Sequence, residues 1–249
     1  MALPEGVDPN RITTGVVLES DGTLRHVPTK VTKGSDAYYA VINSLTNSDY
    51  LMIWNPITFD DMAGHWAEAS VNNMGSRLVV NGVGDGRFNP DADITRAEVA
   101  AIVLRALGLR PEPGNVPFTD VIGSEWYADF VSTAADSGLI AGYEDGSFRP
   151  QNKITRQEAM TMIARAMQIT GLKDQLAESS RLTNALASFK DADNVASWAE
   201  ESAILSVASK VIDGRTLELL EPQAYITRAE VATIVQRLLQ YSNLIEVGN

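Results

Sequence analysis

Ile94-Thr95-Arg96-Ala97-Glu98 has two close copies further along the 249-residue chain. They are Ile154-Thr155-Arg156-Gln157-Glu158 and Ile226-Thr227-Arg228-Ala229-Glu230. In each copy a tryptophan stands 29 positions before the threonine, and the three are Trp66, Trp126 and Trp198. A fixed interval of this kind indicates three copies of one folded unit.

Each copy opens with a Phe-x-Asp motif, and the aspartates are Asp61, Asp120 and Asp191. A first helix is expected next, which in the second copy runs over 125–137 with Trp126 on its apolar face and Gly138 as its stop. A glycine-rich turn follows the helix. It runs from Gly142 to Pro150 in the second copy, and the stretch from Gly84 to Pro90 is its expected match in the first.

The repeated five-residue motif predicts the start of a second helix in each copy, over 96–107, 156–167 and 228–239. Its Thr-x-x-Glu is a capping box, in which the threonine hydroxyl accepts from the amide three residues on and the glutamate accepts from the threonine amide. The capping box accounts for the threonine and the glutamate. It leaves the arginine unexplained.

Arg96, Arg156 and Arg228 occupy the first helical position, where the helix dipole disfavours a positive charge. One interpretation is a site for a carboxylate or phosphate, held by free backbone amides and a guanidinium. The other is an ion pair with a nearby carboxylate, such as the Phe-x-Asp aspartate. Three equivalent copies favour the anion site, and removal of these arginines is then expected to abolish binding without loss of helix.

Composition excludes several classes of function. The net charge is −12, which argues against nucleic acid as a partner, because phosphate binding requires a basic surface. The chain has no cysteine, so disulfides and thiolate metal sites are excluded, and we expect no cofactor and no metal. No apolar stretch approaches the ~20 residues of a membrane span, and the first residues lack the pattern of a signal peptide. An export signal is therefore expected outside this sequence.

The chain divides into five parts. Residues 1–56 are rich in strand-forming residues and predict a meander of antiparallel strands at 14–19, 24–31, 37–45 and 50–54, possible as the end of a larger β domain. Repeats are expected at 57–112, 113–172 and 188–249. The extra length between the second and third repeats predicts an inserted linker at 173–187, expected to be helical. The third repeat also has a divergent turn from Asp213 to Pro222.

This ordered set of motifs resembles the surface-layer homology (SLH) repeat of bacterial cell-surface proteins, over about 59–239. The resemblance implies a mainly α fold in which three helix-loop-helix repeats form a pseudo-threefold trimer within one monomeric chain. It further implies that the first helices form a central three-helix bundle and the second helices form outer prongs. The implied partner is pyruvylated secondary cell wall polymer, a peptidoglycan-linked glycan often ending in pyruvylated N-acetylmannosamine, bound in grooves between repeats. The implied location is the wall of a Gram-positive cell, where such binding anchors secreted S-layer proteins without membrane insertion.

The resemblance also suggests roles for the repeated residues. The arginines would hold the pyruvate carboxylate, and the aspartates would accept from sugar hydroxyls or orient the arginines. The tryptophans would be either a platform for the sugar or core anchors of the bundle. Two turn glycines, Gly84 and Gly142, would let backbone amides approach the ligand. The third groove is expected to differ because its turn diverges.

Three other functions are considered. A glycan-active enzyme is less favoured, since the carboxylates recur at equivalent places and hydrolases use one asymmetric site. The two histidines, His26 and His65, have no repeat counterparts and are taken as incidental. Calcium binding is disfavoured because the turns lack the ligand pattern of a helix-loop-helix site. A helical protein-interaction scaffold stays open.

Overall fold

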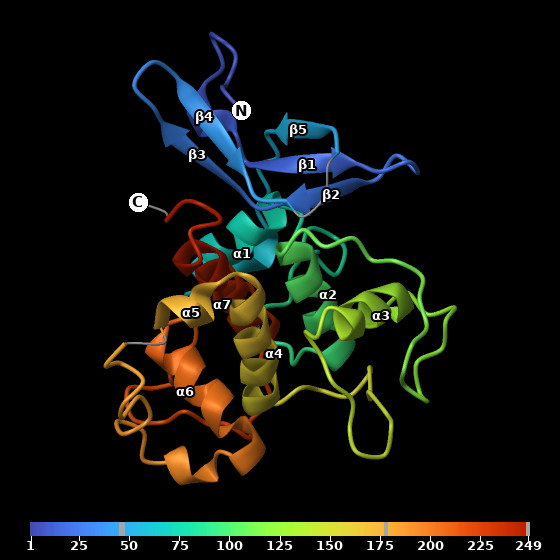
Figure 1. Ribbon diagram of the computed structural model, residues 1–249, viewed down its shortest axis with the longest axis vertical. Coiled ribbons are helices and arrows are strands. Elements are labelled where there is room, and N and C mark those ends of the chain that lie inside the picture. Colours follow the sequence, from blue (N-terminus) through green and yellow to red (C-terminus); the bar gives the residue numbers. More distant parts are fainter. Residues whose placement is uncertain (45–47, 177–178, 248–249) are drawn as a thin grey trace.

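The computed structural model describes residues 1–44, 48–176 and 179–247. The β-strands gather at one end of the molecule, and the helices form the larger part beneath them (Figure 1). The predicted organisation, a small antiparallel β segment followed by a mainly α region, is confirmed.

The β segment contains five described strands in place of the four expected. A short 3-10 helix, η1 (Pro9–Arg11), leads into them. Antiparallel β1 (Thr14–Leu18) lies between β2 (Leu24–Val27) and β5 (Tyr50–Ile53), while β3 (Thr29–Lys33) pairs with β4 (Tyr38–Ile42). Pro28 separates β2 from β3, because proline has no amide to donate to a ladder. The simple meander was therefore wrong, since β5 pairs with β1 and not with β4. Leu45, the end of the third predicted strand, lies outside the described residues.

Each repeat contains the two expected helices. The first helices are α1 (Glu68–Ser76), α3 (Ala128–Asp136) and α6 (Glu200–Ala208), and the second helices are α2 (Arg96–Ala106), α4 (Arg156–Ile169) and α7 (Arg228–Tyr241). Short 3-10 turns, η2 (Asp60–Met62), η3 (Ala192–Asn194) and η4 (Ser197–Ala199), precede α1 and α6. All three second helices start with a complete capping box, as predicted. Gly138 follows α3 at a φ of +70°, which confirms it as the helix stop.

The second helices occupy the position expected for the first. Helices α2, α4 and α7 contact one another, and each also packs against a first helix of a neighbouring repeat: α2 against α3, α4 against α6, and α7 against α1. The implied placement, with first helices central and second helices outside, was wrong. The physical reason is composition, since α2, α4 and α7 bury residues around most of their circumference.

Backbone hydrogen bonds join the three repeats directly in front of the second helices. The Ile154 amide donates to the Ile94 carbonyl (3.2 Å), the Ile226 amide to the Ile154 carbonyl (3.1 Å), and the Ile94 amide to the Ile226 carbonyl (3.2 Å). All three side chains are buried. These bonds close a ring in which the third repeat contacts the first.

The inserted linker is mostly not helical. A five-residue helix, α5 (Leu172–Leu176), directly follows α4, and its two ends are anchored by the buried Leu172 and Leu176. Residues 179–187 form turns, and 177–178 lie outside the described residues. Among the described residues the helix therefore covers only the start of the expected linker, and beyond it Leu182 and Leu186 pack against the core from turns.

The β segment is attached to the helices by a buried arginine. Arg77, just after α1, donates to the Thr29 carbonyl at 3.2 Å and pairs with Glu246 at 2.7 Å. The Glu246 carboxylate also accepts from the Val31 amide at 2.5 Å. His26 of β2 is buried, and burial lowers its pKa to about 3, so it is a neutral core residue.

Candidate functional site

The three motif arginines are buried and paired between repeats. Arg96, Arg156 and Arg228 are 5%, 3% and 8% exposed. Each donates from Nη1 to the capping-box glutamate of another repeat: Arg96 to Glu158 at 3.0 Å, Arg156 to Glu230 at 2.8 Å, and Arg228 to Glu98 at 3.2 Å. The ion-pair interpretation was therefore correct, although its partner is the glutamate of the next motif and not the Phe-x-Asp aspartate. Whether these arginines also hold an anion stays a prediction.

Each arginine also fastens a neighbouring turn. From Nε, Arg96 donates to the Phe148 carbonyl (2.8 Å), Arg156 to that of Leu220 (2.9 Å) and Arg228 to that of Phe88 (2.9 Å). From Nη2, Arg156 and Arg228 donate to a further carbonyl, that of Asp213 or Asn81. Among the described residues Arg96 makes no equivalent third bond. Its Nη2 therefore retains donor capacity toward the cavity that it lines.

The Phe-x-Asp aspartates hold the turns in place. Each carboxylate accepts from two successive backbone amides at 2.7–2.8 Å: Phe88 and Asn89 for Asp61, Phe148 and Arg149 for Asp120, Leu220 and Glu221 for Asp191. Burial alone would raise the pKa of Asp61 and of Asp191, but these amides outweigh it and lower both. In the described residues none of the three forms an ion pair with a motif arginine, so they do not orient those arginines directly.

The repeated tryptophans are exposed. Trp66, Trp126 and Trp198 have 65%, 54% and 59% of their surface open to solvent. The core-anchor alternative was wrong. In the second copy α3 begins at Ala128, so Trp126 lies outside the helical period that the sequence pattern assigned to it. Tyr127, Ala128, Val131 and Ala134 are buried instead.

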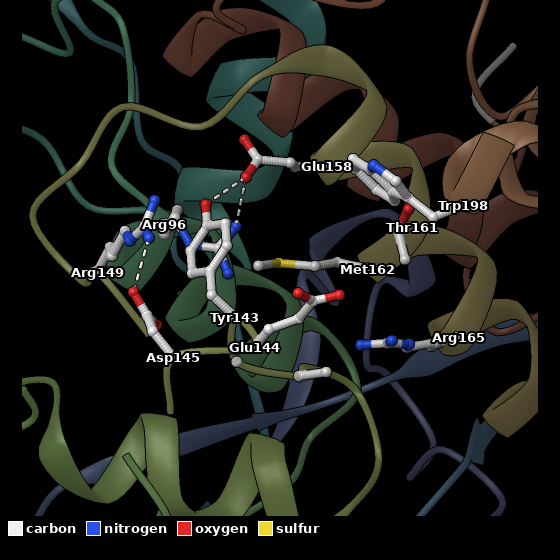
Figure 2. Close-up of a pocket in the computed structure, with 12 residues that line it drawn as sticks. Arg96, Tyr143, Glu144, Asp145, Arg149, Glu158, Thr161, Met162, Arg165 and Trp198 are labelled. Carbon is white, nitrogen blue, oxygen red and sulfur yellow. Dashed lines mark hydrogen bonds and ion pairs between the residues drawn. The ribbon is translucent and has the colours of Figure 1, made fainter. Parts of the chain in front are cut away.

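A cavity of about 670 Å³, named here the α4 groove, lies between the turn after α3, helix α4 and Trp198 (Figure 2). Figure 2 shows Arg96, Tyr143 and Glu158 joined by hydrogen bonds at one end and Arg165 at the other. Trp198 comes from the third repeat. The groove is thus built by all three repeats, and it is lined by Arg96, Ala141, Gly142, Tyr143, Glu144, Asp145, Arg149, Glu158, Thr161, Met162, Arg165 and Trp198.

A second cavity, of about 710 Å³, occupies the equivalent place beside α7 and is named the α7 groove. Trp66 of the first repeat takes the place of Trp198, and Arg156 and Glu230 take the places of Arg96 and Glu158. It is lined by Trp66, Asp91, Asp93, Arg156, Ile212, Asp213, Gly214, Arg215, Tyr225, Thr227, Glu230, Thr233, Ile234 and Arg237.

Gly142 packs closely inside the wall of the α4 groove. A β-carbon there would lie 2.6 Å from the Phe118 ring and 2.8 Å from the Ser147 carbonyl oxygen. Gly82 has the same surroundings in the first repeat, against Phe59. The counterpart of Gly142 is therefore Gly82, and the match with Gly84 was wrong. Gly84 has a φ of +108° and open space around it. Gly82 and Gly142 each stand six positions before a buried phenylalanine, Phe88 or Phe148, and this spacing identifies them as the equivalent pair.

Sequence reasoning missed a second repeated arginine. Arg105, Arg165 and Arg237 stand nine positions after the motif arginines, so the same spacing argument could have found them. Arg165 lines the α4 groove and Arg237 lines the α7 groove. Arg105 lies over the Phe130 ring, 4.7 Å from its centroid.

Tyr143 and Glu158 form a polar cluster in the α4 groove. The Tyr143 hydroxyl donates to Glu158 at 2.5 Å, and burial together with the bond to this carboxylate raises the pKa of Tyr143 to about 12. Burial would raise the pKa of Glu158 as well, but hydrogen bonds from Tyr143 and Thr155 and the charge of Arg96 lower it. The carboxylate is thus held ionised and fully engaged.

In the described residues no group of three or more acidic or histidine side chains is arranged to hold a metal ion. None of the described helices combines the length and apolarity needed to cross a bilayer. The grooves are the features that join the repeated polar and aromatic residues.

Comparison with known proteins identifies the same three repeats in the sequence. The profile of the S-layer homology domain matches residues 58–100, 117–160 and 188–232. The chain is 31% identical over 201 residues to "Exoglucanase XynX" of Acetivibrio thermocellus, covering 80% of this chain and 18% of that protein. It is 32% identical over 185 residues to the "Surface-layer 125 kDa protein" of Lysinibacillus sphaericus, covering 73% and 15%. It is also 28% identical over 239 residues to the "Amylopullulanase" of Thermoanaerobacterium thermosulfurigenes, covering 96% and 12%. The chain therefore spans less than a fifth of each of these relatives.

Proposed function

Because the chain belongs to the S-layer homology domain family, we propose that it anchors protein to the cell wall by binding pyruvylated secondary cell wall polymer in its grooves. Family membership and the surface-layer proteins among its relatives support a secreted chain at the cell surface. The finer proposal concerns the ligand, an acidic glycan linked to peptidoglycan, and the residues that hold it.

The observation that carries this proposal is the exposure of Trp198 and Trp66 on the rims of two arginine-bearing grooves. Each of the three repeated indoles has more than half of its surface open to solvent, although neighbouring rings contact it at Trp66 and Trp126. Such an indole offers a flat apolar face to a sugar ring or to the ketal methyl, while a guanidinium across the groove suits a carboxylate. A cavity of about 670 Å³ is of the size that holds a small ligand such as one or two sugar residues.

The hydrogen-bonded ring through Ile94, Ile154 and Ile226 supports a pseudo-threefold trimer formed within one monomeric chain. In such an arrangement a groove belongs to each interface between repeats. The third would combine Arg228 with Trp126, and the β segment packs beside it, since β2 contacts α2.

We assign the candidate residues as follows. Trp198 and Gly142 form part of the α4 groove, and Trp66 forms part of the α7 groove. Arg96 and Arg156 hold the groove walls together, and Arg96 presents the open edge of its guanidinium to the ligand. The three Phe-x-Asp aspartates and Gly84 act at a distance, through the shape of the turns.

The decisive experiment is sedimentation of the protein with purified cell walls that either retain or lack their pyruvate groups. Trp198→Ala is expected to reduce binding to pyruvylated walls by about fivefold, since stacking of this kind contributes on the order of 1 kcal/mol. The matched control is Trp54→Ala in the β segment, where the tryptophan is equally exposed at 59%. Equal binding by wild type to walls stripped of all polymer would refute the proposal, and would favour the protein scaffold.

We propose further that this chain is not itself an enzyme. The enzyme names among the relatives belong to proteins of which the chain covers less than a fifth. In the α4 groove the half-buried carboxylate of Glu158 is committed to a capping box, a tyrosine and Arg96. Incubation with xylan, starch and cell walls is expected to release no reducing sugar, and any release that Glu158→Gln abolishes would overturn this.

A further inference from the structure

The two grooves differ in the state of the second repeated arginine. Arg165 on α4 and Arg237 on α7 occupy equivalent positions. Each stands nine residues after the motif arginine of its own helix, which is Arg156 on α4 and Arg228 on α7. Each lines its own groove. The two arginines differ, however, in whether a carboxylate of the chain pairs with them.

In the α4 groove Arg165 is unpaired. It is half-buried, and in the part of the chain that the structure describes no carboxylate lies within ion-pair distance of it. Its partial burial, and to a smaller extent the positive charge of Arg96, lower its pKa. Glu158 already neutralises Arg96, and Glu144, which also lines this groove, forms no ion pair with Arg165 among the described residues. Figure 2 shows this guanidinium within the groove, apart from the cluster around Glu158.

In the α7 groove the corresponding charge is neutralised. Arg237 donates from Nη1 to Asp213 at 2.7 Å. Asp213 stands directly before Gly214, in the place that Ala141 holds before Gly142. The groove is therefore supplied with an internal carboxylate by a single substitution in the divergent third turn.

A second arginine of the α7 groove is also neutralised by carboxylates of the chain. Arg215, which replaces Tyr143, is bound by Glu221 at 2.9 Å and by Glu230 at 3.1 Å. Asp91 and Asp93 also line this groove. A carboxylate entering here would meet arginines that already have anionic partners, and two further negative charges.

We propose that Arg165 reads the carboxylate of the acidic glycan in the α4 groove, and that the α7 groove binds the glycan without selecting for its charge. This inference rests on the proposed function and assigns its charge recognition to one groove. A ligand carboxylate would lie between Arg165 and the open edge of Arg96, and the sugar would extend toward Trp198.

The test compares four variants against native and depyruvylated polymer by calorimetry at fixed salt. Arg165→Gln is expected to lose roughly ten- to a hundredfold in affinity for native polymer, the range of a charge-assisted hydrogen bond, with little change for depyruvylated polymer. Arg237→Gln is the matched control on the equivalent position, and is expected to keep the preference for native polymer. Asp213→Asn frees Arg237, so it is expected to add a second site that prefers the pyruvylated form.

The outcomes separate this inference from the proposed function. If wild type binds neither polymer, the function itself is wrong. If wild type prefers native polymer and Arg165→Gln keeps that preference in full, with an unchanged circular-dichroism spectrum, the assignment to Arg165 is overturned. It is equally overturned if Arg237→Gln removes the preference. The conservative variant Arg165→Lys, which retains the charge, is expected to recover part of the loss.

Discussion

Replacement of Arg156 by alanine tests the inter-repeat ion pair most directly. Arg156 is 3% exposed and makes three hydrogen bonds, to the Glu230 carboxylate and to the carbonyls of Leu220 and Asp213. The variant leaves the buried carbonyl of Leu220 and the partly buried carbonyl of Asp213 without this donor. Breaking a buried pair on one side costs about 3–5 kcal/mol, and since Arg215 still neutralises Glu230, we expect the lower end, about 3 kcal/mol. This is a large share of the roughly 5–15 kcal/mol that stabilises a typical domain.

Urea unfolding followed by the helical circular-dichroism signal measures this loss. The matched control is Arg149→Ala. Its side chain is exposed and contacts only Asp145, Ser147 and Tyr143 of its own turn, so its unfolding midpoint is expected to stay close to the wild-type value. A midpoint for Arg156→Ala equal to that of the control would refute the reasoning. The sequence pattern predicted that the motif arginines could be removed without loss of helix. Their burial and their ion pairs predict instead that their removal lowers the stability of the fold. A binding defect in such variants is to be interpreted only after folding has been checked.

Three further predictions address the helix caps, the turns and the groove. Thr227→Ala is expected to lower the free energy of unfolding by about 1 kcal/mol, measured in urea, whereas an unchanged value would show the cap to be dispensable. Asp191 has a lowered pKa in the folded protein, so its contribution to stability is present above the unfolded pKa of about 3.9 and is lost as pH falls through the folded pKa. Asp191→Asn should therefore make the urea midpoint depend less steeply on pH in the acid range. An equally steep dependence would contradict the role of the turn amides. In an ultraviolet titration one tyrosine should ionise near pH 12, and Tyr143→Phe should remove that step, which would persist if another tyrosine were responsible.

Local features of the fold could be predicted from the sequence, because their determinants are adjacent in the chain. The capping box spans four residues, and all three copies form it as expected. The exposure of Trp126 could not be read from helical spacing, since α3 starts at Ala128, three residues later than the apolar pattern suggested.

The partners of the arginines depend on tertiary structure. Arg96 and Glu158 are separated by 62 positions, and Arg228 and Glu98 by 130, so nothing local points from one to the other. The order of the helices in the core likewise follows from total burial and not from the motif. The second arginine of each repeat is a different case, because its constant spacing from the first was visible in the sequence.

The ring of contacts between repeats also limits how such a protein can change in length. In an open solenoid each unit contacts only its neighbours, so units can be gained or lost one at a time. Here every second helix donates an arginine to one repeat and receives one from another, and the third repeat completes the first. Deleting one repeat would leave one motif arginine and one capping-box glutamate without their partners. Inserting a fourth repeat would require at least one of the existing contacts between repeats to break. The number three is therefore a property of the closed interface, and variation is directed into the turns, where Asp213 and Arg215 already distinguish one groove from the other.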